Sequence, residues 1–137
     1  MTVDASKREM LGPGGLDPHI DVTLGGRTYD VVPTFGALVR IEQALGAGLG
    51  ALLLRFLERR HGVTDTTRIL YEGIVARLGN AAPDYEAVGA LVVREGLDAV
   101  SPAAIDLLAA ALRGLETFAA EKTDDGERVA AEGSVAP

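Results

Sequence analysis

The segment from His19 to Leu45 constrains the fold of this chain more than any other. Two short runs of alternating apolar and polar residues flank Gly25-Gly26. A glycine pair adopts the positive φ angles of a two-residue hairpin turn without strain. This turn sets a register in which one face of the hairpin is mostly apolar, with the pairs Ile20–Val31, Val22–Tyr29 and Leu24–Arg27. The other face carries Thr23 opposite Thr28 and Asp21 opposite Asp30, so we expect water to screen the two carboxylates there.

An isolated two-stranded hairpin is marginally stable in water, so its apolar face needs a cover. The next segment predicts a helix that supplies it. Thr34 is a favourable N-cap residue, and Gly46 fits the position just after a helix end. Between them, apolar residues recur at helical spacing: Phe35, Leu38, Ile41, Ala44 and Leu45.

Four further helices are predicted from apolar periodicity and from start and stop residues. They cover roughly 49–60, 64–78, 84–95 and 101–118. Thr64 is the expected cap of the second of these, and Ser101-Pro102 the expected start of the last, because Ser caps helices and Pro is preorganised for the first helical position. The sequence therefore predicts an α+β, mostly α, fold in which an N-terminal β-hairpin packs on a bundle of four to five short helices.

Three segments are expected along the chain. Residues 1–18 are rich in Gly and Pro and show no sustained period, which predicts a flexible leader. Residues 19–120 form a single domain of hairpin and helices. Residues 121–137 are acidic and small, which predicts a disordered tail.

Composition excludes several classes of function. The net charge is −7, whereas a nucleic-acid-binding protein needs a basic surface. There is no cysteine, and hence no thiolate nucleophile or Cys-ligated zinc. No apolar run is long enough to span a bilayer, and the N-terminus lacks the apolar core of a signal peptide. We expect a cytoplasmic protein that binds neither nucleic acid nor membrane.

No motif predicts catalysis. His19 and His61 lie far apart, without the spacing of metal ligands. Ser101 precedes a proline and is interpreted as a helix cap. The glycines of Gly46-x-Gly48-x-Gly50 follow a helix instead of a strand and have no lysine nearby, which is not the context of a phosphate-binding loop. We therefore predict no enzyme, no cofactor and no metal site.

Three apolar residues lie away from the main stripe of their helices: Leu54, Val75 and Val93. Two interpretations remain open. Either these helices are packed on two sides, or the three residues belong to an exposed surface that binds a partner protein.

The segment from Gly26 to Phe118 resembles the small tail-assembly proteins of bacterial gene transfer agents and related siphophage-like prophages, which are also labelled tail tube-like. The resemblance is carried by Gly-Gly-Arg-Thr-Tyr (25–29), Thr-Phe-Gly-Ala-Leu (34–38), Ile-Glu-Gln-Ala-Leu-Gly (41–46) and Ile-Leu-Tyr-Glu-Gly (69–73), then Gly96-Leu97. It implies a non-catalytic tail-assembly chaperone that binds the tape-measure protein, the tail-tube protein or both. A structural tail-tube component is the alternative. A small helical DNA-binding regulator ranks third, since no helix is rich in the residues of a recognition helix.

We also expect that two copies of this chain can associate through the hairpin. A two-stranded hairpin has an outer edge whose backbone groups can pair with a strand from another copy.

Overall fold

The computed structural model describes residues 20–114, 117–118 and 120. The chain divides into two units, one formed by His19–Leu112 and the other by Met1–Pro18 with Arg113–Pro137. Apart from the last residue of the final helix, all elements below belong to the first unit. The predicted leader (1–18) and acidic tail (121–137) lie outside the described residues, and the domain boundaries stay a prediction.

The hairpin has the predicted register. Strands β1 (Asp21–Leu24) and β2 (Arg27–Asp30) pair antiparallel, with Val22 opposite Tyr29. The turn glycines have φ angles of 61° and 82°, as a two-residue primed turn requires. The side chains on the apolar face are buried: Ile20, Val22, Leu24, Tyr29 and Val31. On the other face the Thr23 and Thr28 hydroxyl oxygens are 3.0 Å apart and share a hydrogen bond.

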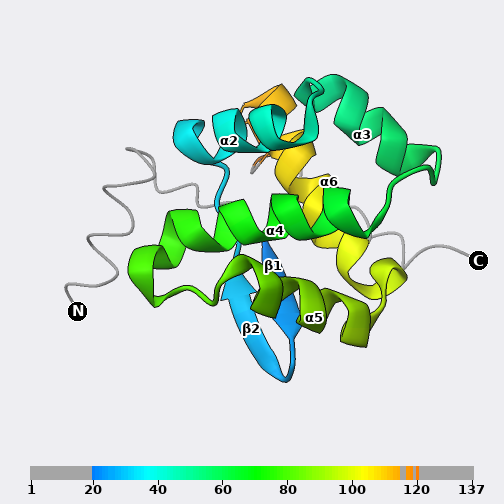
Figure 1. The fold of residues 1–137 in the computed structure, drawn as a ribbon. Coiled ribbons are helices and arrows are strands. Elements are labelled where there is room, and N and C mark those ends of the chain that lie inside the picture. Colours follow the sequence, from blue (N-terminus) through cyan, green and yellow to red (C-terminus); the bar gives the residue numbers. More distant parts are fainter. Residues whose placement is uncertain (1–19, 115–116, 119, 121–137) are drawn as a thin grey trace, which may run out of the picture. The chain divides into compact units, whose positions relative to one another are not determined.

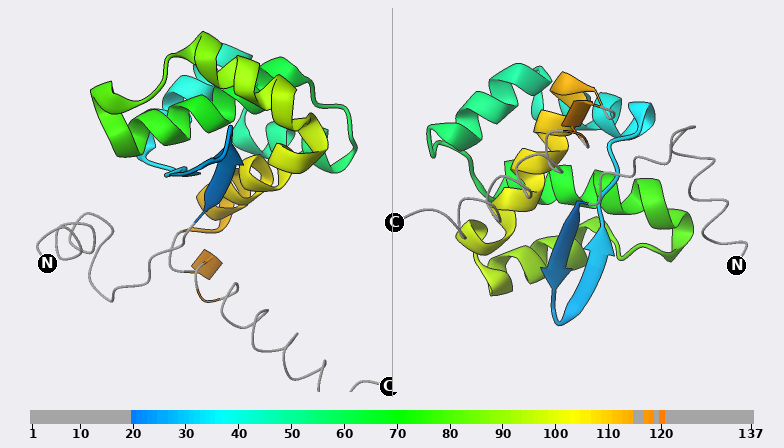
Figure 2. Two further views of the ribbon diagram at one scale, coloured as in Figure 1. Left: turned by 90° about the horizontal axis from the view of Figure 1, so that it is seen from below. Right: turned by 180° about the vertical axis from the view of Figure 1, so that it is seen from behind.

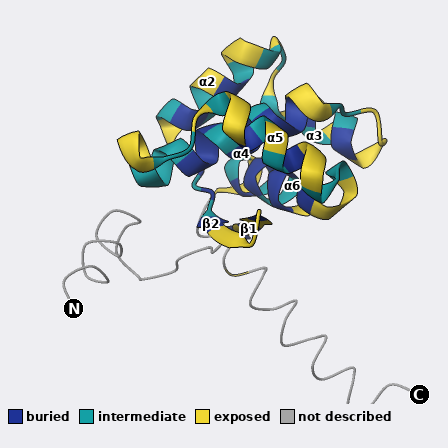
Figure 3. Cartoon of the chain, turned by 60° about the horizontal axis from the view of Figure 1, so that its bottom comes forward, coloured by how far each residue is buried: buried dark blue, intermediate teal, exposed yellow. Residues whose placement is uncertain are grey.

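Five α-helices and one short 3₁₀ turn follow the hairpin in the described part of the chain (Figure 1). In order they are α2 (Phe35–Leu45), α3 (Leu49–Leu57), α4 (Val63–Leu78), η1 (Gly79–Ala81), α5 (Tyr85–Glu95) and α6 (Leu97–Arg113). The predicted fold class, a mostly helical α+β chain with an N-terminal hairpin, is confirmed. Along the helices, exposed residues alternate with buried ones (Figure 3).

Helix α4 is the centre of the first unit. It contacts α2 on one side and α5 on the other, and it packs on β2, while α5 packs on β1 (Figures 1 and 2). Its middle turns are buried, including Ile69, Leu70 and Ile74. Gly73 allows α4 to lie close to the hairpin, because a Cβ atom there would lie 2.8 Å from Val31 Cβ. Beside it, the Val32 N–H donates a 3.0 Å hydrogen bond to the Gly73 carbonyl.

Helix α2 begins and ends where the sequence predicts. The Thr34 hydroxyl accepts a hydrogen bond from the Ala37 N–H at 3.2 Å, and Gly46 has the left-handed conformation that ends a helix. Helix α3 begins at Leu49. Gly48 before it is extended, and the side chain of Glu42 extends from α2 to the start of α3. Its carboxylate accepts a 3.1 Å hydrogen bond from the Leu49 N–H. A carboxylate thus satisfies the start of α3, where the helix dipole favours negative charge.

Two predicted helix starts are wrong. Helix α4 begins at Val63, after Gly62, and not after Thr64. The Asp65 carboxylate caps this end by accepting a 2.8 Å hydrogen bond from the Gly62 N–H. Helix α6 begins at Leu97, directly after Gly96, so Pro102 lies inside the helix and Ser101 does not cap it. The last helix starts earlier because Gly96 both ends α5 and supplies the carbonyl that accepts the first helical N–H bonds.

The predicted apolar stripe of α2 needs correction. Phe35 is 83% exposed and Ala44 is also exposed, whereas Ala37 and Ile41 are fully buried. Phe35 precedes Ile41 by six residues, which places the two about 120° apart around the helix. The buried stripe therefore runs through Ala37 and Ile41 and leaves Phe35 outside.

The hairpin face on which we expected water to screen the two carboxylates is partly covered by protein. Asp30 is half-buried, and its carboxylate lies 3.6 Å from the guanidinium of Arg77 near the end of α4. A cation from α4 thus helps to offset the charge of the carboxylate pair that the register creates.

Candidate partner-binding surface

The three residues predicted to bind a partner differ in exposure. Leu54 on α3 is 53% exposed and Val93 on α5 is 69% exposed, so neither is packed on two sides. Val75 on α4 is half-buried. Leu54 and Val93 lie on different helices, and Figure 1 shows α3 and α5 on opposite sides of α4.

The structure adds further exposed apolar side chains to those predicted. Leu57 at the end of α3 is 61% exposed, and Phe35 and Val63 are exposed as well. The sequence held a signal for Leu57, because α3 contains five leucines and one phenylalanine in nine residues. A helix this apolar covers more than one stripe, so an unburied side is expected wherever a second neighbour is lacking.

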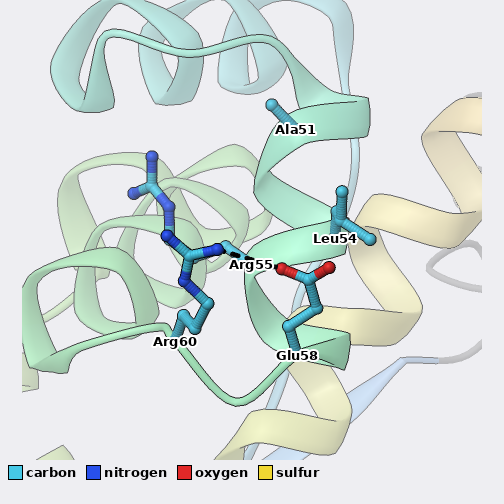
Figure 4. A pocket seen from close by; sticks show the side chains of 5 residues that line it. All are labelled: Ala51, Leu54, Arg55, Glu58 and Arg60. Atoms are coloured by element: carbon cyan, nitrogen blue, oxygen red, sulfur yellow. Dashed lines mark hydrogen bonds and ion pairs between the residues drawn. The ribbon is translucent and has the colours of Figure 1, made fainter.

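A pocket with a volume of about 220 Å³ lies beside Leu54 (Figure 4). Its lining combines apolar and charged side chains: Ala51, Leu54, Arg55, Glu58 and Arg60. The pocket is smaller than the sites that enclose drug-sized ligands. Its size suits the insertion of a single side chain from a partner.

An ion pair fixes the base of α3 next to this pocket. The Arg55 guanidinium donates a 2.6 Å hydrogen bond to Asp65, the residue that also caps α4. This ion pair therefore links the last turn of α3 to the first turn of α4.

Ser101 and His61 form a pair that sequence analysis missed. The Ser101 hydroxyl oxygen lies 3.0 Å from His61 Nε2, and the imidazole stacks on Phe56 at a centroid distance of 4.3 Å. His61 Nδ1 is buried and has no hydrogen-bond partner among the described residues. A catalytic serine needs a histidine oriented by a further group at that nitrogen. The pair instead joins the segment after α3 to α6.

A second polar cluster joins three helices. The Glu72 carboxylate, whose side chain is only 5% exposed, accepts hydrogen bonds from Arg40 at 2.8 Å and Arg68 at 3.0 Å. The Arg68 guanidinium also lies 4.2 Å from the ring centroid of Tyr85 on α5. All of its members are engaged with one another, so this cluster serves the packing of α2, α4 and α5.

Within the described ranges, no group of three or more His, Asp or Glu side chains is arranged to bind a metal ion. No single helix described is long and apolar enough to cross a membrane, although α2 and α3 together meet that length and composition with a bend of 69° between them. Gly46, Gly48 and Gly50 do not form a phosphate site, since Glu42 already occupies the N-terminus of α3.

Comparison with known proteins gives one family. A family model described as phage tail tube protein, GTA-gp10, matches residues 17–114, which is more than half of the chain. Neither a curated protein nor a solved structure matches the chain significantly.

Proposed function

Because this chain belongs to the family described as phage tail tube protein, GTA-gp10, we propose that it is a tail-assembly chaperone, which binds apolar segments of the tape-measure or tail-tube protein. The observation that carries the proposal is the combination of a single two-stranded sheet with exposed leucine and valine side chains on separate helices, in the described part of the chain. Such a protein acts by contact, without catalysis. Its place of action would be the cytoplasm of the producing cell, while particles assemble.

The structural tail-tube role is the second candidate, and the wording of the family description favours it. A tube wall built from continuous sheet requires each subunit to offer several strands and free edges. The described residues supply one hairpin, one side of which is covered by α4 and α5. For this reason we place the chaperone role first.

Fractionation of cells that produce the particles distinguishes the two roles. A chaperone is captured with the tape-measure protein from the lysate and is absent from purified particles. A tube subunit is abundant in the purified particles. Mass spectrometry of both fractions gives the answer, and abundance in the particles would overturn the chaperone proposal.

Three substitutions locate the binding residues. Leu54→Glu and Val93→Glu place a charge on exposed positions, so we expect each to weaken capture of the tail partner while the thermal melting temperature stays near that of the wild type. Val75→Glu alters a half-buried position and is expected to reduce stability as well. Unfolding of all three variants would identify them as core residues.

Self-association through the hairpin edge remains a separate prediction. Thr28→Pro removes a backbone N–H from the exposed part of β2. If another copy pairs there, the variant should shift the sedimentation coefficient toward that of a monomer.

A further inference from the structure

Helix α3 is the least anchored of the described helices. Helices α2 and α5 lie closely alongside α4, and α6 has seven buried residues. Among the described elements, α3 approaches no helix or strand as closely as that, and only Leu52 and Phe56 of its nine residues are buried. A segment with few buried side chains and little packing opens at a lower free energy than the core of the same protein.

The segment before α3 has the properties of a hinge. Gly46 has a φ angle of 64°, and Gly48 is extended. A Cβ atom added at Gly46 would meet no atom of the described residues within 4 Å, and one added at Gly48 would meet only the Glu42 carboxylate, at 3.8 Å. Two glycines with open space around them tolerate large changes of φ and ψ, which is what a hinge requires.

The segment after α3 is strained. Arg59 has a φ angle of 57° and is the one non-glycine residue with a positive φ in the described part of the chain. Two hydrogen bonds of the helix end hold it there. The Arg59 N–H donates to the Phe56 carbonyl at 3.0 Å, and the next N–H donates to the Arg55 carbonyl at 2.8 Å. The left-handed conformation is unfavourable for a residue with a Cβ atom, so the strain favours any state in which this helix end unwinds.

A part-buried ion pair opposes such unwinding by tying α3 to α4. The Arg55 guanidinium lies 2.6 Å from the Asp65 carboxylate, and the two side chains are 34% and 12% exposed. The ion pair between Arg59 and Asp98 on α6 is far more exposed, so it contributes little to holding the segment in place. The link between Arg55 and Asp65 is therefore the polar contact that matters most for the position of α3.

We infer that α3 opens as a unit while α4, α6 and the hairpin stay folded. The chain turns in the segment 46–48 on one side of α3 and at Arg59 on the other, and the ion pair of Arg55 with Asp65 is the latch that opposes opening. Opening relieves the strain at Arg59 and exposes the two buried side chains of α3. This inference goes beyond the proposed function, because it holds for a chaperone and for a tube subunit alike.

Hydrogen exchange of single backbone amides, measured by NMR on the full chain, tests this inference. The amides of residues 53–57 in α3 are compared with those of residues 69–74 in α4, at increasing concentrations of urea below the unfolding transition. We expect the α3 amides to exchange at least about tenfold faster than the α4 amides. The α3 rates should change little with urea because local opening exposes little surface, whereas the α4 rates should rise.

Gly73→Ala separates opening of α3 from unfolding of the whole unit. It disturbs the contact of α4 with the hairpin, which stays formed when only α3 opens. We therefore expect exchange in α4 to become faster by about fivefold or more, while exchange in α3 stays within about twofold of the wild type. If Gly73→Ala does not fold, Ile74→Val gives the same comparison through a smaller change at a buried position of the same helix.

Two further variants with matched controls test the hinge and the latch. Arg59→Gly and Arg59→Ala both remove the ion pair with Asp98, but only glycine relieves the strain, so α3 in Arg59→Gly should exchange more slowly than in Arg59→Ala by about fivefold or more. Arg55→Ala removes the latch and should speed exchange in α3 by about fivefold or more. Arg60→Ala removes an exposed ion pair and should leave exchange in α3 unchanged.

Equal exchange rates in α3 and α4, with the same dependence on urea, would overturn the inference, because α3 would then open only when the whole unit unfolds. A core substitution in α4 that speeds exchange equally in both helices would have the same consequence. Equal exchange of α3 in Arg59→Gly and Arg59→Ala would show that the hinge is not at Arg59. Equal exchange of α3 in the wild type and in Arg55→Ala would show that the ion pair is not a latch.

Discussion

Replacing Gly73 by alanine tests the central contact of the fold. A Cβ atom at this position would lie 2.8 Å from Val31 Cβ, 2.9 Å from Leu107 Cδ1 and 3.2 Å from Val31 Cα. The optimal separation of two carbon atoms is about 3.5–4.0 Å, so three contacts become repulsive at once. Val31 and Leu107 are themselves buried and cannot turn away. The hairpin must therefore shift from α4, which stretches the bond between the Val32 N–H and the Gly73 carbonyl.

The magnitude follows from three contributions. Overpacking of a core position costs about 1–3 kcal/mol. Loss of this stretched hydrogen bond costs about 1 kcal/mol more. Alanine regains about 1 kcal/mol, because its helix propensity exceeds that of glycine. The sum is a destabilisation of about 1–3 kcal/mol, or a fall in melting temperature of roughly 5–20 °C for a unit of this size.

Thermal melting and urea unfolding of Gly73→Ala measure this effect. Gly89→Ala is the matched control, because Gly89 also lies in a helix and faces α4, but its added Cβ would sit 3.5 Å from Thr67 Cγ2, an ordinary contact. The control variant should be more stable than the wild type by about 0.5–1 kcal/mol. If Gly73→Ala melts at or above the wild-type temperature, the close contact of α4 with the hairpin is wrong.

Three further substitutions address other parts of the fold. Glu72→Ala should lower the free energy of unfolding, measured in urea, by about 1–3 kcal/mol. This is less than for a fully buried ion pair, because Arg40 is half-exposed. Arg60→Ala, which removes an exposed ion pair, is the control and should show no comparable loss. Gly46→Ala should lower the free energy of unfolding, measured by thermal melting, by about 1 kcal/mol. The cause is the backbone alone, since φ is 64° at Gly46 and no atom lies within 4 Å of the added Cβ. An unchanged stability would contradict the left-handed helix end. Ser101→Ala should cost about 1–2 kcal/mol by leaving His61 Nε2 without its partner, and an unchanged unfolding midpoint would remove that role.

The hairpin and the helix after it were predictable because local signals agree with one another there. The glycine pair fixes the turn, the turn fixes the register, and the register places Val22 and Tyr29 on one face. Thr34 and Gly46 then mark both ends of α2 with side-chain and backbone preferences that act within a few residues. The turn, the register and both ends of α2 can therefore be predicted without knowledge of any contact distant in the sequence.

The role of Ser101 was not predictable, because it depends on a residue forty positions away. Ser-Pro favours a helix start locally, but Gly96 allows the helix to begin earlier and α6 brings Ser101 against His61. Exposure of Phe35 is a similar case. Its spacing fits an apolar stripe, yet only the packing of α2 on α4 decides which stripe is covered.

The residues that carry the family resemblance serve the fold, and this bears on where function should be sought. In the segment Ile69–Gly73, Ile69 and Leu70 fill the core, Glu72 joins two arginines, and Gly73 admits the hairpin. The turn at Gly25-Gly26 and the start of α2 at Thr34 are likewise structural. A match to these segments therefore identifies the architecture, and partner choice must depend on residues that the architecture leaves exposed. Leu54, Leu57 and the arginines beside them meet that condition without contributing to the core, which is why their substitution can separate binding from folding.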